Sequence, residues 1–197
     1  MAKKKIDRTD TLLDFLKEIE KLKLIDREIY VSTQKRYENS AEHSWHLAMF
    51  VMLFEKDLAK ELDQGKMLKM SLIHDLVEIY AGDTFFYDEK ARINKREREK
   101  KAAHKLFRKL PNALQKDFNK IFDEFEENKT EEAKTVRCFD MLQPMLQNII
   151  SDGYSWKLHG ITAQDIDRRK KDYMNHNSAV FRIYQKLLNE AKKKKLL

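Results

Sequence analysis

Residues 71–80, SLIHDLVEIY, place a histidine and two acidic residues in an otherwise apolar stretch. Most of them are apolar, yet Glu78 follows Asp75 by three residues and His74 by four, so all three side chains can share one side of a helix. Charge within an apolar helix is costly unless it is paired or bound to a metal ion. The stretch therefore predicts a core helix, about 66–80, that carries either a ligand-binding cluster or a buried polar network that only holds helices together.

Outward from this helix, the sequence reads as further helices separated by short breaks. Only 4 Gly and 2 Pro interrupt 197 residues, and apolar residues recur at helical spacing. Residues 26–39 and 81–94 lack this period and are expected to be loops. We expect one all-α domain, residues 1–197, with a core of about 11–191. The other predicted helices are about 11–25, 41–62, 95–109, 111–127, 130–150, 178–191, and one that begins at a capping box of Thr162 and Asp165.

The charged residues, 37% of the chain, are spread as on the outer faces of a soluble helical protein. The formal net charge is +7, but seven lysines lie near the ends. They are Lys3, Lys4, Lys5, Lys192, Lys193, Lys194 and Lys195. Without them, 33 basic and 33 acidic residues remain, which argues against a nucleic-acid surface, because such a surface needs a basic patch on folded structure. We expect these lysines to form solvated, frayed ends.

Three further features bear on the cellular setting. No apolar run approaches the roughly 18 residues of a membrane span. No apolar stretch directly follows the N-terminal lysines, as it would in a secretory signal. Cys138 is the single cysteine, so no intrachain disulfide can form. We expect a cytoplasmic protein whose partners include neither nucleic acid nor membrane.

Ligands that can join His74 and Asp75 lie in two other predicted helices. His43, in NSAEHSWHLAM, lies in the first turn of the second helix if Ser40 is its N-cap. Asp140, in AKTVRCFDMLQPM, shares a helix face with apolar neighbours. Two imidazoles and two carboxylates without a thiolate favour one divalent ion such as Mn, Co, Fe, Zn or Mg. Four protein ligands leave two positions of an octahedral ion open for water and a substrate oxygen, as in a hydrolytic site.

The motifs EHSWH, HDLVEIYAGDT and EEAKTVRCFDMLQPMLQN, taken in this order, are similar to those of the HD-domain metal-dependent phosphohydrolases. The resemblance spans about residues 12–160 and is closest to the branch that contains bacterial 5′-deoxynucleotidases. It implies an all-α HD-type helical bundle, often a homodimer, and hydrolysis of a nucleoside 5′-monophosphate to a nucleoside and phosphate. It carries metal binding to His43, His74, Asp75 and Asp140, and catalytic roles to Glu78 and to Asp83, the latter orienting the substrate.

The same resemblance suggests arginines for the phosphate group. LKLIDRE offers Arg27 at the position of a family arginine, although Glu28 follows it where several deoxynucleotidases have a tryptophan. Arg36 resembles an arginine that is common before the first histidine, with pairing to Glu38 or Glu42 as the alternative. A planar, permanently charged guanidinium suits phosphate. Arg27 and Arg36 are therefore the predicted substrate-binding residues.

The predicted function is metal-assisted hydrolysis of (deoxy)nucleoside 5′-monophosphates. Glu78 relays a proton, either from the attacking water or to the leaving 5′ oxygen. Three alternatives stay open: a non-catalytic HD scaffold with a structural metal, an HD hydrolase of another phosphorylated nucleotide, and a nucleic-acid-binding helical protein. The presence of Glu78 argues against the scaffold, because a structural metal site needs no proton relay.

Other conspicuous residues receive simpler interpretations. Buried supporting or core positions are expected for His46, Trp45, Met49, Met52 and Cys138. Solvated positions are expected for His104, His159, His176 and the run REREKK at 96–101.

Overall fold

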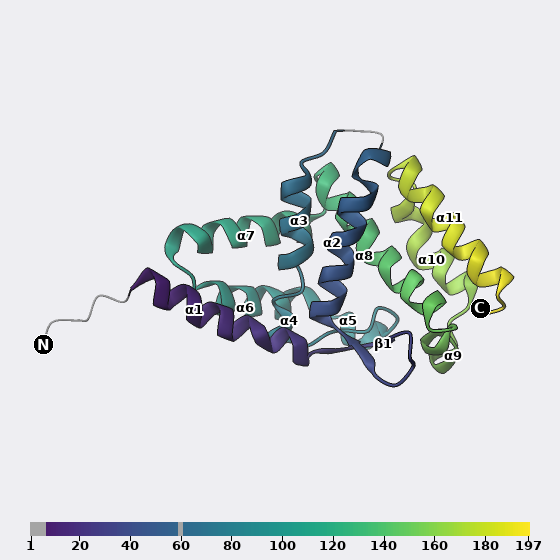
Figure 1. The fold of residues 1–197 in the computed structure, drawn as a ribbon, viewed down its shortest axis with the longest axis horizontal. Helices are drawn as coiled ribbons and strands as arrows, with labels where there is room; N and C mark the ends of the chain where they lie inside the picture. Colours follow the sequence, from purple (N-terminus) through teal and green to yellow (C-terminus); the bar gives the residue numbers. More distant parts are fainter. Residues whose placement is uncertain (1–6, 59–60) are drawn as a thin grey trace, which may run out of the picture.

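The computed structural model describes residues 7–58 and 61–197. Helices dominate them, and their one sheet has two strands, so the expected all-α class is confirmed (Figure 1). A helix able to span a bilayer is not found among these residues. The elements are α1 (Arg8–Ile19), the 3-10 helix η1 (Glu20–Leu24), β1 (Asp26–Tyr30), β2 (Tyr37–Asn39), α2 (Ser40–Phe54), the 3-10 helix η2 (Glu55–Asp57), α3 (Gln64–Ile73), α4 (Glu78–Ala81), α5 (Glu89–Arg92), α6 (Lys95–Phe107), α7 (Asn112–Glu127), α8 (Glu131–Ile150), α9 (Tyr154–His159), α10 (Ala163–Met174) and α11 (Ser178–Lys193).

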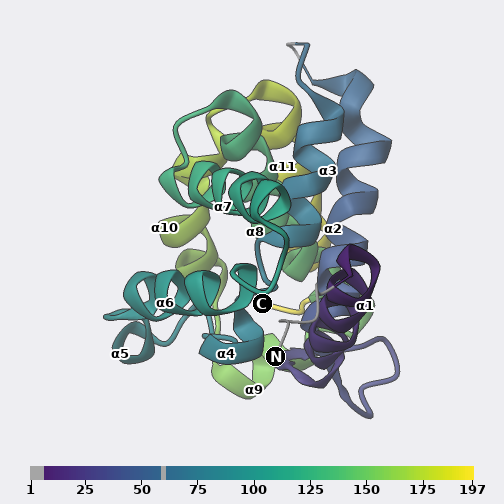
Figure 2. The ribbon, with the colours of Figure 1, turned by 90° about the vertical axis from the view of Figure 1, so that its left-hand side faces the viewer.

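Helix α8 lies at the centre of the fold. It packs against α2, α3, α7, α10 and α11. Helices α1 and α6 lie toward one end of the molecule, and α10 and α11 toward the other (Figure 1). In the end-on view, α5, α6 and α10 lie on one side, and α1 and α2 on the other (Figure 2). Helices that are distant in the sequence therefore meet around α8.

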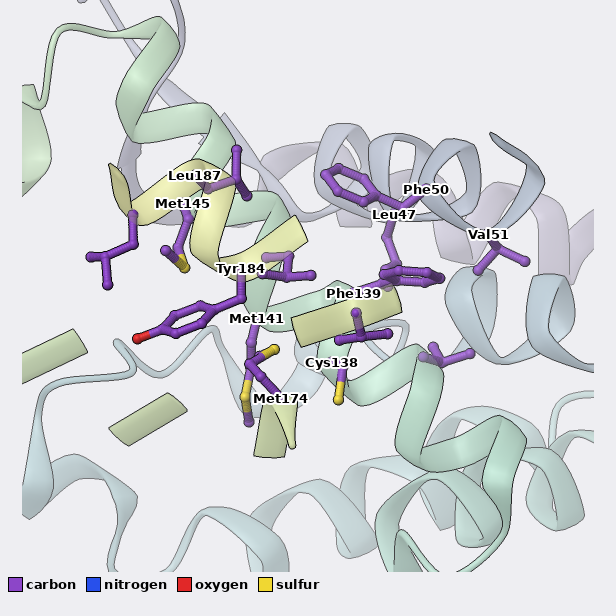
Figure 3. Close-up of a cluster of buried hydrophobic side chains, with 14 of the residues drawn as sticks. Leu47, Phe50, Val51, Cys138, Phe139, Met141, Met145, Met174, Tyr184 and Leu187 are labelled. Carbon is purple, nitrogen blue, oxygen red and sulfur yellow. The ribbon is translucent and has the colours of Figure 1, made fainter. Parts of the chain in front are cut away.

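Two clusters of buried apolar side chains hold these helices together. The large core joins α2, α3, α8, α10 and α11 and includes Leu47, Phe139 and Tyr184 (Figure 3). The small core joins α1, α6 and α7 and includes Phe15 and Phe107. Each fully buried side chain of this size contributes about 1.5–3 kcal/mol. The two cores thus form the framework that positions the polar residues between them.

The start of α2 is set by side chains that satisfy free backbone N–H groups. Asn39, rather than the expected Ser40, is the N-cap. Its side chain accepts from the N–H of Glu42 at 3.0 Å, and the Glu42 carboxylate accepts from the Asn39 N–H at 3.2 Å. This capping box fixes the turn in which His43 lies. The capping box predicted at 162–165 is confirmed at the start of α10.

The helix predicted at 66–80 is interrupted at its polar cluster. Residues 74–77 form a turn between α3 and α4, and within it the N–H of Glu78 donates to the carbonyl of Asp75 at 3.0 Å. A hydrogen bond over three residues winds the backbone more tightly than an α-helix does. Glu78 therefore begins a new short helix instead of lying one α-helical turn beyond His74.

The segment 26–39, predicted as a loop, contains the two strands. They run antiparallel, with Tyr30 opposite Tyr37. Along β1, Arg27 and Ile29 turn toward the interior, and the residues before and between them are exposed. An alternation that buries an arginine does not resemble the apolar–polar alternation of an ordinary strand, which explains the incorrect prediction.

The C-terminal lysines 192–195 are exposed, as expected, but the chain end is held on the fold instead of fraying. Helix α11 continues to Lys193, and Leu196 is 7% exposed and belongs to the large core. Gly153, whose φ is +67°, lies against it, because a Cβ atom there would come within 2.9 Å of the Leu196 Cβ. The close approach thus requires glycine. The N-terminal lysines 3–5 lie outside the described residues.

Helix α2 exposes apolar side chains on its outer face. Trp45 is 63% exposed and Met52 is 54% exposed, so their interpretation as core residues is wrong. Met49 is half-buried. The inner face of the same helix carries Leu47 and Val51, both fully buried. Only one face of α2 packs against the core, and the opposite face is exposed.

Candidate metal centre

The four predicted metal ligands meet at one place, although they come from three parts of the chain. His43 lies in α2, His74 and Asp75 in the turn after α3, and Asp140 in α8. His43 Nε2 is 3.0 Å from Asp140 Oδ1 and 3.7 Å from Asp75 Oδ2. His74 Nε2 is 3.1 Å from Asp75 Oδ1 and 3.8 Å from Asp140 Oδ1. One atom each of His43, His74 and Asp75 lies within 4.8 Å of the others, as around a single ion.

Both histidines are oriented by hydrogen bonds on the side away from this cluster. His43 Nδ1 is 2.8 Å from Gln143 Oε1, and His74 Nδ1 is 3.0 Å from the backbone oxygen of Ser71. Carbonyl oxygens accept hydrogen bonds, so each Nδ1 carries a proton and each Nε2 faces the other ligands. The Gln143 amide is itself oriented by donating to Glu38 at 2.7 Å. Contacts of this kind fix ligand histidines in metal sites.

The carboxylates of the centre favour positive charge beside them. Burial lowers the pKa of His74, but the carboxylates of Asp75 and Asp140 more than offset this and raise it to about 10. Burial alone would raise the pKa of Asp140, but His43 and His74 hold it well below its ordinary value. Among the described residues, His74 Nε2 is a buried nitrogen without a hydrogen-bond partner. A divalent ion would supply the charge and use this nitrogen, so the residues fit the predicted metal.

Arg27 and Glu78 adjoin the predicted ligands. Arg27 Nη1 donates to Asp75 Oδ2 at 3.0 Å and lies 3.8 Å from Asp83 Oδ1. Glu78 is 1% exposed, and its Oε2 accepts from the Ser40 hydroxyl at 2.6 Å. Burial, reinforced by the carboxylates of Asp75 and Asp83, raises the pKa of Glu78 well above its ordinary value. A carboxyl group whose pKa is raised in this way is more easily protonated than an ordinary glutamate, which suits a proton relay.

Arg36 lies apart from these residues. Its guanidinium donates two hydrogen bonds to the Glu42 carboxylate, at 2.8 and 2.7 Å, and its side chain is 57% exposed. It is not among the described residues that line the cavity at the centre. The structure therefore places Arg36 in the alternative arrangement, as a partner of Glu42. The reason is local, because the capping box of α2 holds Glu42 within its reach.

A cavity of about 500 Å³ extends from the centre. This volume is in the range of small-molecule sites. Of the predicted residues, His43 is fully buried behind it. Those that line the cavity are His74, Asp75, Asp140, Glu78, Asp83 and Arg27.

The remaining wall of the cavity includes residues that sequence reasoning missed. We call five of them the distal wall; they lie in the loop after α4, in α6 and in α10, and are Phe86, Lys95, Glu99, Arg169 and Lys170. The interpretation of REREKK as a solvated face is wrong at Glu99, which is 5% exposed and pairs with Lys95 at 3.0 Å. The spacing of four residues between these two was the available signal.

Three lesser interpretations can also be compared with the structure. His46 Nδ1 lies 3.2 Å from Gln143 Nε2, so His46 supports the His43 network, as expected. Cys138 is 1% exposed, and burial raises the pKa of its thiol to about 12, in agreement with an inert residue. His159 packs on Phe85, with ring centroids 4.5 Å apart, instead of being free in solvent.

Comparisons with known proteins agree with this geometry. The family model described as "HD domain" matches residues 19–181. The 5′-deoxynucleotidase HDDC2 of Xenopus laevis is 30% identical over 138 residues, which cover 70% of this chain and 67% of that protein. A 5′-deoxynucleotidase of Erwinia tasmaniensis is 28% identical over 127 residues, which cover 60% of this chain and 64% of that protein. A crystal structure described as a predicted metal-dependent phosphohydrolase from Magnetospirillum magnetotacticum MS-1 has a TM-score of 0.87 and 35% identity, covering 96% of this chain and 98% of that one.

These matches cover different shares of the matched proteins, but all of those proteins are described as nucleotidases or phosphohydrolases. The two nucleotidases are matched over about two thirds of their own length, and the solved structure over nearly all of its length. The expected resemblance to HD-domain phosphohydrolases, and to 5′-deoxynucleotidases among them, is confirmed. Since the family model also matches most of the sequence, the chain belongs to the HD domain family.

Proposed function

We propose that the protein is a metal-dependent phosphohydrolase that converts (deoxy)nucleoside 5′-monophosphates to a nucleoside and phosphate. The observation that carries the proposal is the meeting of two histidines and two aspartates at a cavity of about 500 Å³, with the buried Glu78 beside them. The similarity to 5′-deoxynucleotidases supports the substrate class.

One divalent ion of Mn, Co, Fe, Zn or Mg is the proposed cofactor, held by His43, His74, Asp75 and Asp140. When bound, it supplies a Lewis acid that lowers the pKa of a coordinated water and polarises a phosphate oxygen. The hydrogen bonds on their Nδ1 atoms leave the Nε2 atoms of both histidines facing the carboxylates of Asp75 and Asp140, where they would hold the ion. The protein thus contributes an oriented, electron-rich set of ligands.

Glu78 is the proposed proton relay. Attack of water on phosphorus breaks the bond to the 5′ oxygen, so one proton leaves the water and the departing oxygen gains one. Glu78 can take the first proton and deliver the second, because its pKa is raised by burial and by its acidic neighbours. The hydrogen bond from Ser40 to Oε2 holds the carboxyl group in place.

Arg27 and Asp83 are the proposed substrate-orienting residues. The Arg27 guanidinium lies between the carboxylates of Asp75 and Asp83, where it can offset negative charge on the phosphoryl oxygens. Asp83 follows Gly82 directly after α4 and lines the cavity, so that its carboxylate can accept a hydrogen bond from a sugar hydroxyl.

Phosphate release from a panel of nucleotides, each with several divalent ions, tests the proposed function. We expect deoxynucleoside 5′-monophosphates to be hydrolysed and the reaction to stop when a chelator removes the metal. Turnover of triphosphates or cyclic dinucleotides alone would contradict the substrate class. Metal binding without hydrolysis of any phosphoester would instead support the non-catalytic scaffold.

We also propose that the protein forms a homodimer. Helices α1, α2 and α3 carry large exposed apolar side chains, and we infer that a second copy of the chain covers them. They are Leu16, Trp45, Met52, Leu53 and Leu72. Light scattering should give twice the chain mass of 23.6 kDa, and Trp45→Lys should shift it toward the monomer. A monomeric native protein at micromolar concentration would contradict the proposal.

The proposed location is the cytoplasm. Its support is the single cysteine, Cys138, which is buried and has no second cysteine to pair with. Cell fractionation should recover the protein with cytosolic markers, and recovery in a membrane or secreted fraction would contradict this.

A further inference from the structure

Lys170 is a buried lysine in the distal wall of the cavity. It lies in α10 and is 4% exposed. Its Nζ donates to the backbone oxygen of Met141 at 2.7 Å, which leaves two of its three N–H groups unused. The ammonium also lies 5.1 Å from the centroid of the Phe86 ring. Burial lowers the pKa of Lys170 to about 8, so the group still carries its proton at pH 7.

Four other basic residues that line the cavity are only partly buried, and each has a carboxylate partner. The four pairs are Arg27 with Asp75 at 3.0 Å, Lys95 with Glu99 at 3.0 Å, Arg137 with Glu126 at 2.9 Å, and Arg169 with Glu89 at 2.6 Å. Lys170 differs, because no carboxylate of residues 7–58 or 61–197 lies within ion-pair distance of its Nζ. The carboxylate with the largest electrostatic effect on its pKa is that of Asp140, a predicted metal ligand.

A buried ammonium without a counter-ion is expensive unless a ligand supplies the charge. The position of Lys170 identifies the chemistry of that ligand. It lines the same cavity as Asp140 and Arg27, and it is close enough to feel the charge of both. An anionic group bound at the metal centre would therefore lie within the field of this ammonium.

We propose that Lys170 is a phosphate-binding residue of this site, whose ammonium pairs with a phosphoryl oxygen of the substrate. The proposal rests on the proposed phosphohydrolase function and adds a cation to it from a different helix. Two unused N–H groups can donate to two oxygens of one phosphate. Lys170 thereby serves as a substrate-binding residue, while Glu78 keeps the proton-transfer role.

Inorganic phosphate is the probe for the test, with calorimetric titration of the metal-loaded protein as the measurement. Lys170→Met keeps the length and apolar stem of the side chain and removes its charge. Lys171→Met is the matched control, because Lys171 is the next residue of the same helix and is exposed. We expect Lys170→Met to weaken phosphate binding about 10- to 100-fold, the worth of a hydrogen bond to a charged group, and Lys171→Met to leave it unchanged.

Metal content and thermal stability, measured on the same samples, separate this role from a structural one. If Lys170 binds phosphate, Lys170→Met should retain its metal and melt at or above the temperature of the wild-type protein. Should Lys170→Met fail to fold, Lys170→Gln provides a second test, because its amide can still donate to the Met141 carbonyl. Unchanged phosphate affinity in either folded variant would overturn the proposal, as would a lowered melting temperature with normal affinity.

The failure of the proposed function is distinguishable from the failure of this inference. Loss of phosphate binding in Lys170→Met, with no hydrolysis of any nucleotide by the wild-type protein, would support the phosphate-binding role and overturn only the nucleotidase activity. Hydrolysis of 5′-monophosphates with an unchanged KM in Lys170→Met would overturn the role of Lys170 and leave the proposed function intact.

Discussion

The candidate metal centre and the distal wall line the same cavity but differ in their unpaired charge. Carboxylates dominate the first, and the second contains the ammonium of Lys170, which is unpaired within the described part of the chain. At the candidate metal centre, burial lowers the pKa of His74, but the carboxylates of Asp75 and Asp140 more than offset this effect and raise it to about 10. In the distal wall, Lys170 is a buried cation without a carboxylate partner among the described residues. The carboxylates of the first region therefore favour a cation beside them, and the unpaired ammonium of the second favours an anion. A divalent ion would pair with the carboxylates, and a phosphate group bound to that ion would pair with Lys170. The two regions together therefore fit such a ligand better than either region does by itself.

The largest effect is expected from breaking the metal centre. His74→Ala or Asp140→Ala removes a ligand and should abolish binding of the single divalent ion, with turnover reduced about 10³-fold or more, since the metal supplies several kcal/mol of transition-state stabilisation. Metal analysis and phosphate release on the same preparation check this. Full metal occupancy in both variants would show that the four residues are not the ligands.

The next effect separates chemistry from metal binding within the centre. Glu78→Gln preserves size and removes the proton-accepting charge, so turnover should fall about 10²-fold or more while metal is retained. Metal content, melting temperature and turnover are measured together. Lost metal that excess metal restores would identify Glu78 as a ligand. A lower melting temperature with normal turnover would identify a structural partner of Ser40.

A smaller effect, on stability, tests the charge of the distal wall. The pKa of Lys170 falls from 10.5 to about 8 on folding. Below pH 8 the lysine is therefore charged in both the folded and the unfolded protein, and burial of this charge lowers the free energy of unfolding by its full amount. Between pH 8 and 10.5 only the unfolded chain keeps the proton, and the wild-type protein gains stability as the pH rises. Denaturation should therefore show Lys170→Met more stable at pH 7, by up to about 3 kcal/mol, with the difference shrinking toward pH 10. A constant difference would contradict the buried charge.

The smallest effect is expected outside both regions. Arg36→Gln should change KM less than about twofold and the free energy of unfolding by less than about 1 kcal/mol, because Arg36 forms an exposed ion pair with Glu42. Arg27→Gln is the matched comparison, and its KM should rise at least about tenfold through loss of a charged hydrogen-bond donor. Equal effects of the two substitutions would contradict their different placement.

The clustering of the predicted ligands could be anticipated from the sequence because its signals are local, although their role as metal ligands stays a prediction. His74 and Asp75 are adjacent in an apolar stretch, and Asp140 falls on the apolar face of a helix. Lys170 belongs to four consecutive basic residues, RRKK at 168–171, and only the packing of α10 decides which of them is buried. The strand β1 was missed for a related reason, because the inward side chain of Arg27 looks like a surface residue.

The same limit applies to the ends of the chain and to the outer face of α2. Lys192 to Lys195 suggested a solvated tail, but Leu196 beyond them fits against Gly153. Trp45 was expected in the core, and only the position of α2 shows that it faces outward. The single-domain boundary at 1–197 stays a prediction.

The turn at residues 74–77 joins the two cores. Met70 belongs to the large core, and Ile73 and Leu76, on either side of His74 and Asp75, belong to the small one. The other two predicted ligands come from helices of the large core. An ion at this point would add a cross-link between the two cores, which also meet through α3 and α7, and would make their unfolding more cooperative. With a chelator present, the small core should lose its amide hydrogen-exchange protection at a lower denaturant concentration than the large core, and with metal bound both should open together.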